Sequence, residues 1–177
     1  MLTSIIRIFI LLGLFFSSLS SAISYTDNGD GTVTDASNGL TWMRCSMGQT
    51  WDGTTCTGTA STYTWAAATA LTYTFAGQND WRLPNIRELQ TITDKTQSNP
   101  AIDTTAFPNT PSSYFWSGSS YVASPASAWG VGFGDGSSGA SLRRATATSG
   151  WCAADSLLPF CPRRVQMPII PITGMER

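Results

Sequence analysis

The alternation of apolar and polar positions is clearest in the stretch YTDNGDGTVTDASNGLTWM, residues 25–43. Short segments rich in Thr, Val, Leu and Trp are separated there by Asn-Gly and Asp-Gly, dipeptides that favour the tight turns of β-hairpins. The pattern predicts short antiparallel strands joined by turns. The segments YFWSGSSY and AWGVGFGDG predict two further strands, with a turn at residues 134–136.

Two segments between these strands have helical patterns. Residues 64–72 (TWAAATALT) are rich in alanine. In the second segment, Asn85 can cap a helix that continues through IRELQTITDK to Lys95, and Glu88 stands at the capping-box position. A long irregular stretch with three prolines follows at residues 98–113. Strands, two helices, a long loop and further strands predict an α+β domain.

The N-terminus has the features of a cleavable signal peptide. Arg7 precedes an apolar run from Ile8 to Phe16, and small residues follow up to Ala22. Because this run is too short to span a bilayer, the sequence predicts a signal peptide at residues 1–22 and an exported chain without a membrane span. The alternative is an uncleaved membrane anchor.

The four cysteines fit an exported protein, in which disulfides form readily. Cys45 and Cys56 bracket a turn-rich segment, and a disulfide between them is predicted; zinc is the alternative, but the chain has no histidine. Whether Cys152 and Cys161 pair is left open. No metal site is expected, because Asp27–Gly31 fits a hairpin turn better than a calcium loop.

Charge and missing residue types exclude several classes of function. Residues 23–142 contain four basic and nine acidic residues, which argues against nucleic-acid binding. The absence of histidine removes the commonest general base, and the only glutamates are Glu88 and Glu176. No G-x-S-x-G motif and no phosphate-binding glycine loop is present. We therefore expect neither an enzyme nor a cofactor.

Aromatic residues beside polar groups are the remaining candidates for a site. Asp80, Trp81 and Arg82 combine an aromatic face with charged groups, although a core position of Trp81, with Asp80 and Arg82 paired to each other, is the favoured alternative. The long loop at residues 98–113 and the region after it offer further ligand contacts. These contacts are Tyr114, Trp116, Tyr121 and Trp129.

Several segments together resemble the Lcl C-terminal domain family of bacterial exported proteins. They are YTDNGDGTVTDASNGLTWMRC, GQTWDGTTC, NDWRLPNIRELQ, NPAIDTTAFPNTPSSYFWS and AWGVGFGDG. The resemblance implies a C-type-lectin-like fold, in which short strands and two helices support a long irregular binding surface. Related lectin-like domains act as surface receptors or adhesins, and the family has no established catalytic activity.

The chain departs from the family pattern after Leu142. Members usually end in a strand of the type Y-V-R-x-V-R-G, whereas this chain continues LRRATATSGWCAADSLLPFCPRRV. Back-translation of residues 144–156 with permitted codons allows a second frame, S-D-S-Y-V-R-x-V-R-G-R-Q. The prediction is a domain at residues 23–142 followed by an atypical, frameshifted tail at residues 143–177 that does not pack as a closing strand. A divergent tail is the alternative.

The sequence thus predicts an exported, non-catalytic recognition or adhesion domain that binds an extracellular glycan or a protein. Two alternatives stay open: a structural module of a cell-envelope assembly, and a defective copy with a frameshifted C-terminus. A homo-oligomer is compatible with either role.

Overall fold

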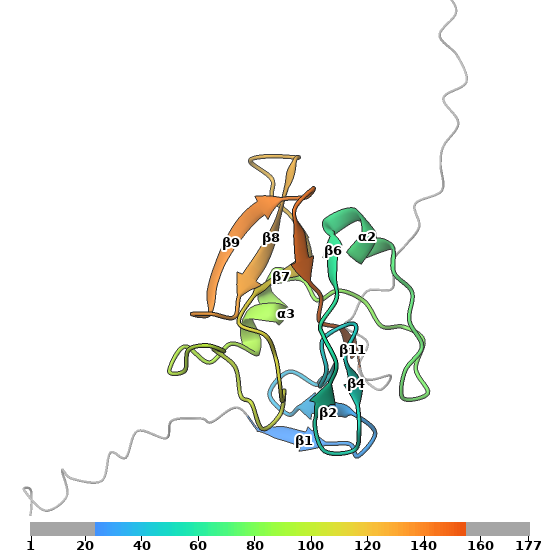
Figure 1. Cartoon of the computed structure of the whole chain (residues 1–177). Helices are drawn as coiled ribbons and strands as arrows, with labels where there is room; N and C mark the ends of the chain where they lie inside the picture. The colour runs from blue at the N-terminus through green and yellow to red at the C-terminus, as the bar shows by residue number, and fades with distance from the viewer. Residues whose placement is uncertain (1–23, 155–177) are drawn as a thin grey trace, which may run out of the picture.

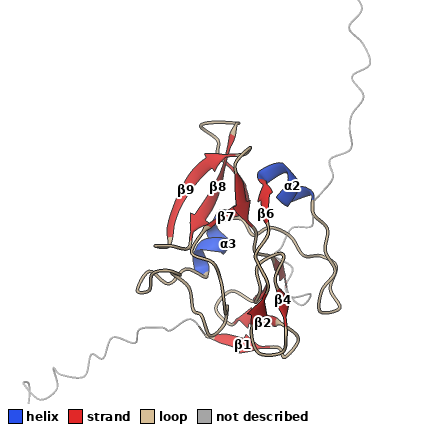
Figure 2. Ribbon diagram, viewed as in Figure 1, coloured by secondary structure: helices blue, strands red, loops and turns tan. Residues whose placement is uncertain are grey.

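A computed structural model describes residues 24–154 of the chain. The predicted signal peptide and the segment after Ala154 lie outside these residues. The described part is mostly β-sheet with two short helices, an α+β fold (Figures 1 and 2). A four-stranded sheet with the order β1-β2-β3-β11 and a five-stranded sheet with the order β6-β10-β7-β8-β9 form its two main parts.

The N-terminal hairpins form as the sequence predicts. Strands β1, β2 and β3 pair antiparallel, and glycines with positive φ occupy the turns between them. The last strand of this sheet comes from the other end of the described chain, because β11 pairs antiparallel with β3. The bounds are β1 Tyr25–Asp27, β2 Thr32–Asp35, β3 Leu40–Met43 and β11 Cys152–Ala154.

The five-stranded sheet is built on the two strands predicted from YFWSGSSY and AWGVGFGDG. Strand β8 pairs antiparallel with β7 on one side and with β9 on the other, and β10 joins β7 to β6. A pair of two-residue strands, β4 and β5, forms a separate ribbon. The bounds are β4 Thr50–Trp51, β5 Cys56–Thr57, β6 Thr62–Thr64, β7 Tyr114–Ser120, β8 Ser127–Gly132, β9 Ser137–Leu142 and β10 Thr146–Thr148.

Both predicted helices are present. Helix α2 (Trp65–Ala70) starts at the cap Thr64, whose side chain accepts a hydrogen bond from the Ala67 amide. Helix α3 (Ile86–Thr91) has the predicted capping box between Asn85 and Glu88. The expected continuation of α3 to Lys95 is wrong: the helix ends at Thr91, because the backbone of Thr93 pairs with Ile102 of the long loop in a β-bridge.

The main core lies between α3 and strands of both sheets. A cluster of buried side chains fills this space, and the large ring of Trp42 is only 1% exposed. Two smaller clusters lie around Trp116 and around Trp81 with Trp151. The main cluster consists of Val33, Trp42, Leu89, Ile92, Ile102, Ala106, Phe107, Phe115, Val131, Phe133 and Cys152.

The expectation that the chain from Arg143 does not pack is wrong for residues 143–154. Strand β10 lies between β6 and β7, and β11 completes the N-terminal sheet. Trp151 is 1% exposed and Cys152 is fully buried. The prediction failed because it looked for large apolar residues in 143–150, whereas the interior accepts the small side chains of Ala147, Thr148 and Ser149. The prolines at 159, 162, 168 and 171 lie outside the described residues.

Candidate functional site

The long loop between α3 and β7 is tied to the fold along its length. Ala101 and Ile102 are buried in the interior. The Ala101 amide donates to the carbonyl of Phe133 at 2.7 Å, and the Asn99 amide donates to that of Gly134 at 3.0 Å. Because apolar side chains and backbone bonds fix this loop, its outer surface has a defined shape.

Arg44 anchors the middle of the loop through hydrogen bonds to its backbone. Its Nε donates to the Ala106 carbonyl at 3.0 Å, and its Nη2 donates to the Thr105 carbonyl at 2.7 Å. Its Nη1 pairs with Asp27 at 2.7 Å, and the guanidinium lies 4.3 Å from the ring centroid of Trp51. The planar guanidinium therefore joins the N-terminal hairpin to two carbonyls of the loop.

Residues 45–56, which we call the disulfide segment, hold the C-terminal part of the loop. Cys45 and Cys56 are bonded as predicted, with their Cα atoms 5.4 Å apart. The Asn109 amide donates to the Cys56 carbonyl at 2.8 Å, and Gln49 donates to the Asn109 carbonyl at 3.1 Å. Asn109 has a φ of 54°, a left-handed conformation that asparagine adopts more readily than most residues.

An open cleft of about 540 Å³ lies on the loop between these anchors. We call it the long-loop cleft. Its lining offers hydroxyl groups, amide groups and proline rings and carries no charged side chain. The lining residues are Asn99, Pro100, Thr104, Pro108, Asn109, Thr110, Pro111 and Ser112.

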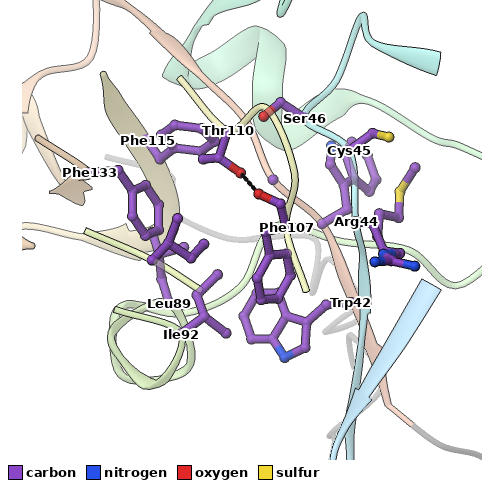
Figure 3. Close-up of a pocket in the computed structure, with 14 residues that line it drawn as sticks. Trp42, Arg44, Cys45, Ser46, Leu89, Ile92, Phe107, Thr110, Phe115 and Phe133 are labelled. Carbon is purple, nitrogen blue, oxygen red and sulfur yellow. Dashed lines mark hydrogen bonds between the residues drawn. The ribbon is translucent and has the colours of Figure 1, made fainter. Parts of the chain in front are cut away.

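A much smaller cavity of about 20 Å³ lies beneath the loop, inside the main core (Figure 3). Phe115, Phe133 and Leu89 surround it, and Thr110 lines both this cavity and the cleft above. The Thr110 hydroxyl donates to the Phe107 carbonyl at 2.9 Å. The volume suits about one water molecule, so the cleft is the part of the loop that can accept a ligand.

The Asp80, Trp81 and Arg82 group is divided between surface and core. Asp80 is exposed, whereas Trp81 is 5% exposed and donates from Nε1 to the Phe75 carbonyl. Arg82 pairs bidentately with Glu88, at 2.8 Å for each nitrogen. Arg82 therefore forms an ion pair with Glu88 and not with Asp80, the partner considered in the sequence analysis. Trp81 and Arg82 border a second hollow of about 380 Å³ beside α2.

The four aromatic candidates on β7 and β8 form two pairs. Trp116 is fully buried and donates from Nε1 to the Tyr63 carbonyl, with Tyr114 packed edge-on at 5.5 Å. Tyr121 and Trp129 are half-buried, with their rings perpendicular and their centroids 5.2 Å apart. Of these four, Trp116 alone is fully buried, whereas Tyr114, Tyr121 and Trp129 are half-buried.

Local hydrogen bonds lower the pKa of three carboxyls in the described residues. Hydrogen bonds from the Thr55 and Thr54 amides lower the pKa of the Asp52 carboxyl. Bonds from Thr96 and Ser137 lower the pKa of Asp94 and Asp135 in the same way. Burial raises the pKa of the Tyr114 phenol to about 12. Residues 24–154 contain no cluster of three or more potential metal ligands.

The model of the Lcl C-terminal domain matches residues 31–154. The chain belongs to the Lcl C-terminal domain family. The match confirms the resemblance found in the sequence, and it includes residues 143–154. No curated protein and no solved structure matches the chain. Within the described residues, no helix of this Lcl C-terminal domain is long and apolar enough to cross a membrane.

The sequence analysis indicated the long loop but named none of the cleft residues of this Lcl C-terminal domain. Asn99, Pro108 and Asn109 have the composition of ordinary turns, and only their anchoring turns them into the wall of a cleft. A usable signal in the sequence was the combination of three prolines with the large apolar residues Ile102 and Phe107 in one loop, and the structure buries both. A loop that is only a connection has no need of buried apolar side chains.

Replacing Cys45 and Cys56 together with serine is expected to lower the free energy of unfolding by about 2–4 kcal/mol, because the bond constrains the unfolded loop. Denaturant unfolding measures this change. Adding a reductant should lower the free energy of unfolding of the parent protein toward that of the double variant and leave the value for the variant unchanged. A free thiol at Cys45 in exported protein would contradict the assignment.

Proposed function

We propose that this protein is an exported, non-catalytic recognition domain that binds a carbohydrate or protein ligand through the long-loop cleft. The observation that carries the proposal is the cleft itself, about 540 Å³ in volume and lined by neutral hydrogen-bonding groups. Such groups can donate to and accept from ligand hydroxyls or peptide amides without the cost of burying a charge.

The anchoring of the loop supports this role, because a site that is already in its binding conformation loses less conformational entropy on binding. Arg44 and Asn109 hold the loop from two sides. The two sheets, two helices and one long, packed loop are compatible with a C-type-lectin-like arrangement, which we propose as the fold type. The Cys45–Cys56 disulfide supports export, since such bonds persist in oxidising compartments.

The absence of catalysis is part of the proposal. The chain has no histidine, and the lowered pKa values of Asp52, Asp94 and Asp135 make these carboxyls poor proton donors near neutral pH. We also propose that no cofactor is needed. The hypothesis of a shifted reading frame stays a prediction, and the genomic DNA sequence across codons 138–157 tests it.

A glycan array and a panel of extracellular proteins, probed with the exported domain, test the proposal. Saturable binding without turnover of the bound compound is expected. Thr104 and Ser112 are both exposed and both line the cleft. Replacing either with tryptophan should fill the cleft and weaken binding by about tenfold or more, with unchanged thermal unfolding.

Thr54→Trp is the matched control, because Thr54 is exposed in the disulfide segment and does not line the cleft. Binding that survives both cleft variants would place the site elsewhere. No saturable binding to any probe would favour the alternative role, a structural module of a cell-envelope assembly.

A further inference from the structure

Two turns lie side by side at one end of the five-stranded sheet. The turn between β7 and β8 contains Tyr121 and Val122. Leu142 is the last residue of β9, and the turn between β9 and β10 that follows it contains Arg143 and Arg144. The Arg143 amide donates to the Ala126 carbonyl at 2.9 Å, and its Nε donates to that of Ser127 at 3.1 Å. We call this region, together with Trp129 and Trp65, the hairpin end; its turns project beyond the sheet (Figure 1).

The tip of the hairpin end is apolar and open to solvent. Val122 is 94% exposed and Leu142 is 43% exposed. Among the described residues, only one other large apolar side chain, Tyr73 at 39%, is exposed to a similar degree. Single exposed apolar residues are common on proteins, but these two lie at the same end of the sheet, Val122 in the β7–β8 turn and Leu142 as the last residue of β9.

Aromatic rings form the layer behind this tip. Tyr121 packs edge-on against Trp129, and both are half-buried. Trp65 is half-buried as well, and the guanidinium of Arg143 lies 4.1 Å from its ring centroid. The Trp65 amide donates to the Arg143 carbonyl at 3.0 Å, which ties the start of α2 to the same end.

The hairpin end is basic, although the domain around it is acidic. Residues 24–154 contain six basic and nine acidic residues, but no Asp or Glu occurs in residues 62–72, 114–132 or 137–154. These three segments build the whole hairpin end, which contains Arg143 and Arg144. The nearby start of α3 bonds to Ser119, and its Glu88 is already paired with Arg82.

We propose that the hairpin end docks this domain on an anionic lipid bilayer. Val122 and Leu142 enter the edge of the acyl region, Tyr121, Trp129 and Trp65 lie at the level of the head groups, and the two arginines contact anionic head groups. This order of apolar, aromatic and basic groups matches the polarity gradient of a bilayer surface. A fluid surface accepts a projecting tip without a complementary groove. The inference goes beyond the proposed function and does not depend on the cleft.

Sedimentation with vesicles tests the proposal. The protein is recovered after export, and its mass is measured so that its N-terminus is known. We expect binding to vesicles of phosphatidylcholine with phosphatidylglycerol, weaker binding to phosphatidylcholine alone, and loss of binding at high salt. Val122→Asp should lower the partition coefficient by about tenfold, and Arg144→Gln by about fivefold, the effect of one basic residue near an anionic surface.

Two matched controls lie away from the hairpin end. Thr54→Asp adds the same negative charge in the exposed disulfide segment, and Lys95→Gln removes one positive charge near the opposite turn, beside Gly136. Both should bind vesicles as the parent does. Because Val122 is almost fully exposed, Val122→Asp should unfold at the parent temperature; Val122→Ser, with a smaller but parallel loss of binding, is the second variant.

Three outcomes would overturn the proposal. The first is no binding to the anionic vesicles. The second is equal loss of binding in Val122→Asp and Thr54→Asp. The third is an oligomer in vesicle-free solution that Val122→Asp dissociates while vesicle binding is absent, which would make the hairpin end a contact between copies of this chain.

Discussion

Trp116→Ala is expected to lower the free energy of unfolding by about 3–5 kcal/mol, the range for truncating a fully buried aromatic side chain. Trp116 is 0% exposed and contacts residues from α2, β10 and β8, among them Ala68, Ala147 and Ala128. The small neighbours cannot expand into the space that the indole leaves. Chemical denaturation followed by circular dichroism measures the change.

Trp129→Ala is the matched control, because it removes the same side chain from a half-buried position on the neighbouring strand. A smaller loss of about 1–2 kcal/mol is expected there. The loss of unfolding free energy for Trp116→Phe should fall between these two values. Phenylalanine keeps most of the side-chain volume but leaves the Tyr63 carbonyl without its indole donor. Equal losses for Trp116→Ala and Trp129→Ala would contradict the core position of Trp116.

Arg44→Met is expected to lower the free energy of unfolding by about 2–4 kcal/mol, because the Ala106 and Thr105 carbonyls lose charge-assisted hydrogen bonds while the side-chain volume is retained. The same change should weaken ligand binding in the long-loop cleft, since the loop loses its central anchor. Arg44→Lys should recover only part of the stability, because one ammonium cannot reach all of these acceptors in the guanidinium geometry.

Asp27→Asn measures the contribution of the Asp27–Arg44 ion pair to stability separately from that of the hydrogen bonds between Arg44 and the two carbonyls. The Asp27 side chain is 58% exposed, so its pairing with Arg44 is screened by water and its loss should cost within about 1 kcal/mol. Unfolding in denaturant at low and high salt measures both variants. A loss for Asp27→Asn as large as that for Arg44→Met would show that the ion pair, and not the anchoring of the loop, carries the effect.

Local features of this fold could be predicted from the sequence. The turns of the N-terminal sheet depend on neighbouring Asn, Asp and Gly residues, and the start of α3 depends on Asn85 and Glu88, three residues apart. The Cys45–Cys56 bond closes a short segment. Each of these features involves groups close in the chain, so the pattern of residue types is sufficient to identify it. The family could also be identified, because its motifs are local.

Burial of individual tryptophans could not be predicted in the same way. Trp81 stands between two charged residues in the sequence and yet lies in a core, whereas Trp116 and Trp129 both stand on predicted strands and differ, the first buried and the second half-buried. Which face of a strand points inward depends on what packs against the sheet. Of the seven predicted site residues, Trp81 and Trp116 are therefore core residues, although their types suit a ligand.

The sequence by itself determined the hairpins, the helix starts, the disulfide and the family of this protein. Tertiary structure decided that β10 and β11 complete the two sheets, because strand pairing between distant segments has no local signature. It also decided that the loop at residues 98–113 forms a cleft. That loop is shaped by Arg44, which lies 62 positions before Ala106 in the chain, and by the hydrogen bond from Asn109 of the loop to Cys56. Contacts over such distances depend on the folded chain as a whole.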